Sequence, residues 1–201
     1  MTKWSFLLLL PLLFLTEVSA EERIHKMGIV LVPVGEVDGK VLEGLTDDLH
    51  RTFGRKISIG KGMPQPDDAY NKKRNQYLST AILKTLMAEK DYRAYEKVLG
   101  VVDQDLYVPD LNFVFGEAGR KVAVISLTRL RQEFYHLPQD QNLFYQRVLT
   151  EAVHELSHTY GLGHCPNPRC VMFFSNSLTD TDRKGSTFCQ ECKRKLEKKN
   201  G

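Results

Sequence analysis

Apolar and polar residues are grouped along the chain in blocks that predict strands and helices in turn. The apolar, β-branched run 27–34, which ends at Gly35, predicts a buried strand, and 98–102 predicts another. Between them, 40–53 and 71–89 carry apolar residues at helical spacing. Strands that alternate with helices in this way indicate an α/β layer arrangement.

Three shorter segments extend this pattern. The alternating run 56–59 predicts a further strand. The runs 111–115 and 121–127 are separated by the four residues 116–119, with glycine at both ends, and this spacing favours a hairpin. We therefore expect a mixed sheet with backing helices.

A long helix is predicted from residue 140 onward. Asp140 or Asn142 can cap it, and the pattern continues to about Tyr160. His154 lies about 200° around the helix from the nearest members of its apolar stripe. The histidine side therefore faces a cleft or another surface. The stripe consists of Tyr145, Val148, Leu149, Ala152 and Leu156.

Length and composition limit the classes of protein to consider. The 201 residues suffice for one ordinary domain, and 42% hydrophobic with 26% charged residues is typical of a globular chain. The net charge of +3 is small, and no nucleic-acid-binding motif is present. We therefore expect no nucleic-acid partner.

The first twenty residues differ from the rest. Lys3 precedes an apolar run at 6–15, and the small residues of 18–20 suit a cleavage site. The alternative is an uncleaved membrane anchor, but a span needs ~20 apolar residues and this run is interrupted by Pro11. We predict a signal peptide at 1–20, a secreted or periplasmic protein, and no membrane span after its removal.

The segment HELSHTYGLGH at 154–164 contains the candidate metal ligands and a candidate general base. His154 and His158 are four apart, so both imidazoles project from one helix face and can bind one ion. Glu155 is rotated by about 100°, which suits a general base acting on a metal-bound water. Gly161 can turn the chain sharply, and His164 can then return as the third ligand.

The alternative for this string is an exposed helix that happens to be rich in histidine. For the full pattern H-E-x-x-H-x-x-G-x-x-H, the composition of the chain gives a chance match on the order of 10⁻⁵. We therefore predict a catalytic zinc site in which Glu155 assists attack of the metal-bound water.

Four cysteines follow at spacing C-x4-C and C-x2-C: Cys165, Cys170, Cys189 and Cys192. Two close pairs separated by such a loop are typical of a structural zinc site. Export would favour two disulfides instead, with three possible connectivities. The short segment after His164 has few large apolar residues, so it needs a cross-link, either a metal ion or disulfides, to be stable.

The pattern 154–164 resembles that of the metzincin metalloproteases, with Met172 as the methionine of their Met-turn. The following FSNSL at 174–178, Asp182 and FCxxC at 188–192 resemble the archaemetzincins. Upstream, FVFGEA at 113–118 and VISL at 124–127 are also similar to that family. The signal peptide lies outside the resemblance. Phe174 stands where some metzincins carry a tyrosine, and a phenyl ring cannot replace its hydroxyl.

The resemblance implies a zincin-like α/β fold with a twisted mixed sheet, an active-site helix and a small zinc-stabilised C-terminal part. We expect an N-terminal subdomain at 21–164 and a C-terminal one at 165–201. The resemblance also adds to the case for zinc at the cysteines, and so for two Zn²⁺ in all.

The implied activity is that of a zinc metallopeptidase acting on peptides or proteins. The substrate would lie extended along a sheet-edge strand, for which the candidate is Phe113, Val114 and Phe115. The alternative is a zinc-dependent peptide-binding module without catalysis. Glu155 argues against this alternative, because pure binding needs no general base.

Overall fold

The computed structural model describes residues 28–200. The predicted signal peptide lies outside the described residues. Within the described range, no helix is both long and apolar enough to cross a membrane.

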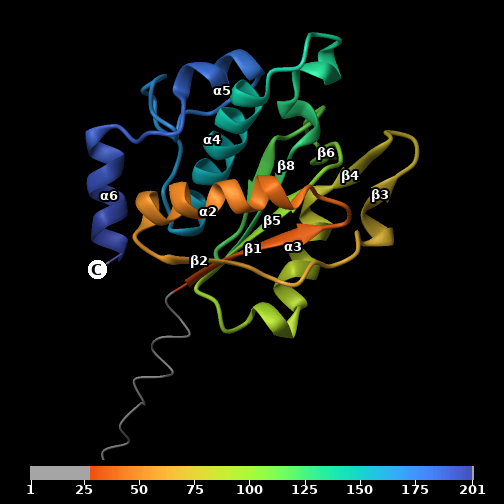
Figure 1. Cartoon of the computed structure of the whole chain (residues 1–201), viewed down its shortest axis with the longest axis horizontal. Coiled ribbons are helices and arrows are strands. Elements are labelled where there is room, and N and C mark those ends of the chain that lie inside the picture. Colours follow the sequence, from red (N-terminus) through yellow and green to blue (C-terminus); the bar gives the residue numbers. More distant parts are fainter. Residues whose placement is uncertain (1–27, 201) are drawn as a thin grey trace, which may run out of the picture.

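A five-stranded mixed sheet forms the centre of the protein (Figure 1). Its strand order is β2-β1-β5-β8-β7. The first four of these strands are parallel to one another, and β7 is an antiparallel edge strand paired with β8. The bounds are β1 Gly28–Val34, β2 Lys56–Ile59, β5 Lys97–Val102, β7 Gly116–Ala118 and β8 Val122–Ser126. The expectation of a mixed sheet is confirmed.

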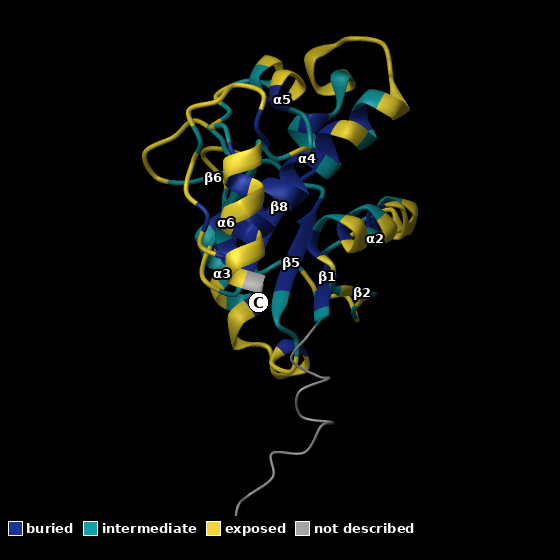
Figure 2. Cartoon of the chain, turned by 90° about the vertical axis from the view of Figure 1, so that its left-hand side faces the viewer, coloured by how far each residue is buried: buried dark blue, intermediate teal, exposed yellow. Residues whose placement is uncertain are grey.

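Helices cover both faces of this sheet, as the layer argument predicted. Ile29 and Leu31 of β1 share a core with α2 (Gly39–Phe53) and α4 (Gln141–Thr159), whereas alternate residues of β1 pack toward α3 (Ser79–Ala88). The central strands are therefore buried on both faces (Figure 2).

The segment 71–89 does not form one long helix. Its first part belongs to a small second sheet, made of β3 (Tyr70–Asn71), β4 (Gln76–Leu78) and β6 (Leu106–Tyr107). Asn75 has a φ of 52°, a left-handed conformation that reverses the chain between β3 and β4. The helical prediction was wrong up to Leu78, the end of β4, and within this segment only α3 is helical.

The predicted hairpin is shifted along the sequence. The residues 116–119 were expected to form its turn, but β7 occupies the first three of them, and the chain reverses after Ala118. Gly119 N–H closes the reversal onto the Val122 carbonyl at 2.8 Å. Val114 makes only an isolated bridge to Leu106, and Phe115 packs into the core.

The remaining C-terminal helices are α5 (Leu178–Lys184) and α6 (Gln190–Asn200). Val171, Met172 and Leu196 belong to the same core cluster as α2 and α4. The C-terminal segment is therefore packed into the main core, with the basic face of α6 exposed to solvent (Figure 2). Short 3₁₀ helices lie at Asp67–Ala69, Lys90–Tyr92, Thr128–Leu130 and Gln132–Tyr135.

Candidate active site

Helix α4 positions two of the three histidines. It begins after Asp140, whose side chain accepts a hydrogen bond from the Leu143 N–H at 2.9 Å, so the predicted cap is confirmed. After α4, Gly161 has a φ of 79°, the left-handed turn that the sequence predicted. His164 returns to His154 and His158, and one nitrogen from each of the three rings lies within 4.8 Å of the others.

Main-chain carbonyls fix the orientation of two of these rings. His154 Nδ1 lies 2.6 Å from the Val171 carbonyl, and His158 Nδ1 lies 2.7 Å from the Leu162 carbonyl. Because a carbonyl only accepts, each Nδ1 carries the hydrogen and each Nε2 presents a lone pair.

The two Nε2 atoms of His154 and His158 face each other at 3.1 Å. Two lone pairs at this distance repel unless a cation lies between them. Two nitrogens bound tetrahedrally to zinc at ~2.0–2.1 Å lie roughly 3.3 Å apart, so the spacing fits such an ion. Burial lowers the pKa of both histidines, which favours the neutral form that a metal requires.

Glu155 lies beside these rings and is 6% exposed. Burial raises the pKa of Glu155 well above its usual range, and the charge of Glu151 acts in the same direction. The ammonium of Lys184 opposes both effects. On its other side, Glu155 lies against the edge strand: a Cβ added to Gly116 would be 2.5 Å from Glu155 Cγ.

Glu151 and Lys184 form a buried ion pair that the sequence reading missed. The Lys184 Nζ lies 3.2 Å from a Glu151 oxygen, and the two side chains are 0% and 2% exposed. Thr181 donates to Glu151 at 3.0 Å, and Lys184 donates to the Phe173 carbonyl at 3.3 Å. The only sequence signal was that Glu151 precedes Glu155 by four residues, on the same helix face.

A second pair links the same two helices one turn earlier. Arg147 donates to both carboxylate oxygens of Asp182 at 2.7 and 2.8 Å. Its third hydrogen bond goes to the Leu130 carbonyl at 3.1 Å. Asp182, which the sequence singled out only through the family resemblance, therefore serves to attach α5 to α4.

The histidines and Glu155 line a cleft of about 730 Å³. One wall is β7 with the residues before it, and the other is the C-terminal part of α4 with 174–176. Phe113, Val114 and Phe115 do line this cleft, but the strand at the edge of the sheet is β7.

Met172 and Phe174, which the family resemblance places at the Met-turn near the metal, differ in burial. Met172 is completely buried in the core, and its carbonyl accepts from the Cys165 N–H at 2.8 Å. Phe174 is 42% exposed, and its ring centroid lies 4.9 Å from that of His164. Phe174 therefore lies beside the histidines without a hydroxyl to offer.

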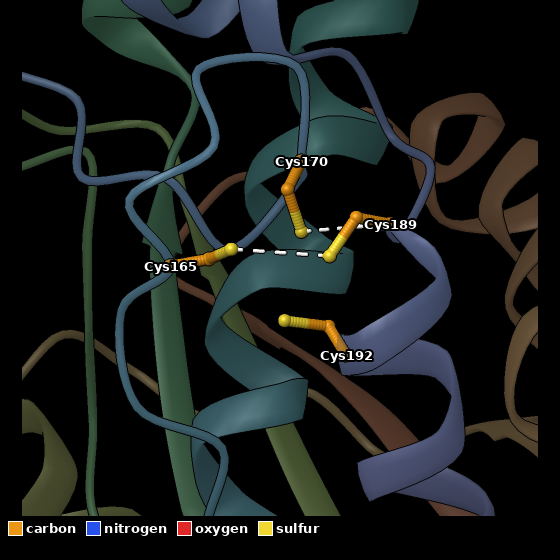
Figure 3. Close-up of side chains that lie close together, drawn as sticks. All are labelled: Cys165, Cys170, Cys189 and Cys192. Atoms are coloured by element: carbon orange, nitrogen blue, oxygen red, sulfur yellow. Dashed lines mark hydrogen bonds between the residues drawn. The ribbon is translucent and has the colours of Figure 1, made fainter.

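The four cysteines converge on one point (Figure 3). Their sulfurs lie within 4.8 Å of one another, and none is in a disulfide. Cys165 and Cys189 are separated by 3.9 Å, close to the ~3.8 Å between two sulfurs bound tetrahedrally to zinc at ~2.3 Å. The spacing fits a metal site and is far longer than the ~2.05 Å of a disulfide.

Hydrogen bonding prepares one of these thiols for ligation. The hydrogen bond from the Cys192 N–H is the largest cause of a lowered pKa at Cys189, which is about 7. Hydrogen bonds with the neighbouring cysteine side chains act in the same direction. Burial raises the pKa of Cys170 and Cys192, since it disfavours thiolates that no cation neutralises. The histidine and cysteine clusters thus each offer a complete set of donors.

Comparison with known proteins agrees with this geometry. Residues 55–198 match the model of peptidase family M54. The archaemetzincin of Pyrococcus furiosus is 46% identical over 181 residues, which are 86% of this chain and 94% of that protein. The archaemetzincin of Pyrococcus horikoshii is 52% identical over 162 residues, or 78% of this chain and 86% of that one.

Solved structures resemble the fold as well. The crystal structure of archaemetzincin from Methanopyrus kandleri has a TM-score of 0.77 and 38% identity, and the match covers 87% of this chain and 96% of that one. A zinc-dependent peptidase from Methanocorpusculum labreanum has a TM-score of 0.75 and 31% identity over 84% of this chain and all of that one. The chain therefore belongs to peptidase family M54, the archaemetzincins, which are zinc metallopeptidases.

Proposed function

We propose that this protein hydrolyses peptide bonds with two bound zinc ions, one at the three histidines and one at the four cysteines, and with Glu155 as the general base. The observation that carries the proposal is the pair of facing Nε2 lone pairs of His154 and His158, with Glu155 buried beside them at the cleft. Zinc at the histidines supplies a Lewis acid, which acidifies water and polarises a carbonyl.

The part played by Glu155 follows from its surroundings. Its carboxylate takes a proton from the attacking water and delivers it to the leaving nitrogen as the C–N bond breaks. Burial raises its pKa, so it accepts a proton more readily than an exposed carboxylate would. Glu155 packs directly against Gly116, where any Cβ would collide with its side chain.

We assign substrate binding to β7, with Phe113 to Phe115 contributing side-chain contacts. In the β7–β8 ladder, Glu117 is opposite Val124. Main-chain hydrogen bonds lie on either side of this pair: the Ser126 N–H donates to the Phe115 carbonyl, and the Gly119 N–H donates to the Val122 carbonyl. Because bonded pairs alternate in an antiparallel ladder, the N–H and C=O groups of Gly116 and Ala118 point away from β8. An extended peptide can add to these groups as a further strand.

The second candidate function is a zinc-dependent peptide-binding module. Phe174 favours it, because no hydroxyl at this position aids the transition state. The two functions share zinc and peptide binding and differ only in turnover.

We also propose that the protein is exported, on the composition of residues 1–20. Expression of the full chain, followed by mass spectrometry of the extracellular or periplasmic fraction, tests this proposal. A mature N-terminus at Glu21 supports it, and an intact chain confined to the cytoplasm contradicts it.

The deciding experiment measures zinc and turnover together in Glu155→Gln. Elemental analysis should give two zinc ions per chain in both proteins, while cleavage of a peptide library should fall by about 10²–10⁴-fold in the variant. Glu43→Gln, on the exposed face of α2, is the matched control and should retain full activity. Equal cleavage by Glu155→Gln would exclude Glu155 as the base, and no cleavage by the native protein would favour the binding module.

A further inference from the structure

Two exposed positive charges lie at or beside one end of the cleft. Arg120 lies within the reversal between β7 and β8, lines the cleft and is exposed. Gly161 also lines the cleft, and a Cβ added to it would be 3.0 Å from the Nζ of Lys199, which therefore lies beside the cleft and not among its lining residues. Neither Arg120 nor Lys199 has an ion-pair partner among residues 28–200, so both charges are available to a ligand.

A third cation joins the two walls at this end. The Lys97 Nζ donates to the Arg120 carbonyl at 3.0 Å and to the Thr159 carbonyl at 2.6 Å. Burial lowers the pKa of Lys97, and Glu96 opposes this effect. The Glu96 carboxylate is itself bound by Arg55 at 2.9 Å.

The acidic residues that line the cleft lie elsewhere or are already bound. Glu151 is paired with Lys184, and Glu155 lies at the histidines. The Glu117 carboxylate accepts hydrogen bonds from Ser79 and Thr80 of α3, on the other face of the sheet. The end near Arg120 therefore carries positive charge that no lining carboxylate offsets.

The distance from the reacting centre to this end is short. Gly116 touches Glu155, and Arg120 follows four residues later, which is at most roughly 13 Å at the rise of a strand. A peptide extended along β7 would thus reach Arg120 within about four residues of the scissile bond.

We propose that Arg120 and Lys199 bind a carboxylate of the substrate, so that this cleft selects peptides with an acidic group within four residues of the bond that is cut. The inference rests on the proposed peptide cleft. The carboxylate belongs either to an Asp or Glu side chain or to a free C-terminus. Lys97 is a positioning residue, since its ammonium is occupied by two carbonyls and holds Arg120 at the end of α4.

Equilibrium binding to zinc-loaded Glu155→Gln protein tests this preference without turnover. The probes are capped ten-residue peptides in which one Glu is moved along the sequence, each paired with its Gln counterpart, and one peptide with a free rather than amidated C-terminus. One position should bind roughly fivefold tighter with Glu than with Gln, as expected for an exposed ion pair. The difference should shrink as salt is raised.

Substitution at Arg120 then identifies the site. Adding Arg120→Gln should abolish the preference, and Arg120→Glu should reverse it, so that the Gln peptide binds more tightly than its Glu counterpart. Lys198→Gln removes an equivalent exposed charge from α6 away from the cleft and should change nothing. A preference for the free C-terminus over every Glu position would assign the carboxylate to the terminus.

Three results would overturn the proposal: no Glu preference at any position, an unchanged preference in Arg120→Gln, or no peptide binding. Hydrolysis by the native protein separates this proposal from the function on which it rests. Peptides that are cut without regard to charge contradict only the carboxylate site. Peptides that bind with the preference but are never cut contradict only the peptidase.

Discussion

The histidine cluster and the cysteine cluster are joined by a single peptide bond, between His164 and Cys165, but their surroundings differ. The histidines line an open cleft with a buried carboxylate beside them. The cysteines offer four thiols, of which Cys170 and Cys192 are buried in the main core.

The difference lies in what each donor set leaves open. Three imidazoles leave a fourth position on a tetrahedral zinc for water or substrate, whereas four thiolates complete the shell. The same metal would therefore act chemically at the first site and hold the chain at the second. Because the Cys165 N–H also bonds the Met172 carbonyl, the cysteine site fixes the segment that carries His164.

The strongest test of this comparison removes one thiol. Cys192→Ser should reduce bound zinc from two ions to one and lower the melting temperature sharply, because structural zinc contributes as much as ~10–16 kcal/mol in zinc-finger peptides. Elemental analysis and calorimetry measure both. Glu155→Gln is the reference, since it should retain both ions and the melting temperature. Unchanged zinc and stability in Cys192→Ser would contradict the structural role.

The sequence predicted the histidine cluster because its spacing is local, and the cysteine cluster because two close pairs at such a separation are typical of a zinc site. His154, His158 and Gly161 lie on one helix and its end, where geometry follows from sequence separation alone. The Glu151–Lys184 pair depends on how α5 packs on α4, and no local spacing encodes that packing. The shift of β7 has a similar cause, since the long-range bridge of Val114 to Leu106 competes with the expected strand.

Breaking the buried Glu151–Lys184 ion pair should have the next largest effect on stability. Lys184→Met leaves the Glu151 carboxylate buried beside the site, and removing one partner of such a pair costs about 3–5 kcal/mol of unfolding free energy. Denaturant unfolding measures it. The double variant Lys184→Met with Glu151→Leu should recover part of the loss, because no charge is then left alone.

An exposed pair gives the matched control for this variant. Lys195 and Glu191 are an i, i+4 pair on the surface of α6, and Lys195→Met should leave the unfolding midpoint unchanged. If Lys184→Met were equally harmless, the pair would not be what holds α5 and the Phe173 segment against the active-site helix.

The smallest expected effect comes from a substitution that should slow catalysis at the histidine site without removing its metal. Gly116→Ala adds a Cβ 2.5 Å from Glu155 Cγ and 2.7 Å from the Val124 carbonyl, so the carboxylate or the edge strand must move. A displacement of about 1 Å can reduce turnover by ~10²-fold, and overpacking costs about 1–3 kcal/mol. We expect kcat to fall while both zinc ions remain.

Gly119→Ala is the control for Gly116→Ala, because its added Cβ would meet nothing closer than the Val122 carbonyl at 3.6 Å, an ordinary contact. Its kcat should stay near the native value. A loss of zinc in Gly116→Ala would mean that β7 supports the histidines themselves. An unchanged kcat would mean that Glu155 does not need the narrow space beside the glycine, and that the carboxylate reaches the attacking water from another position in the cleft.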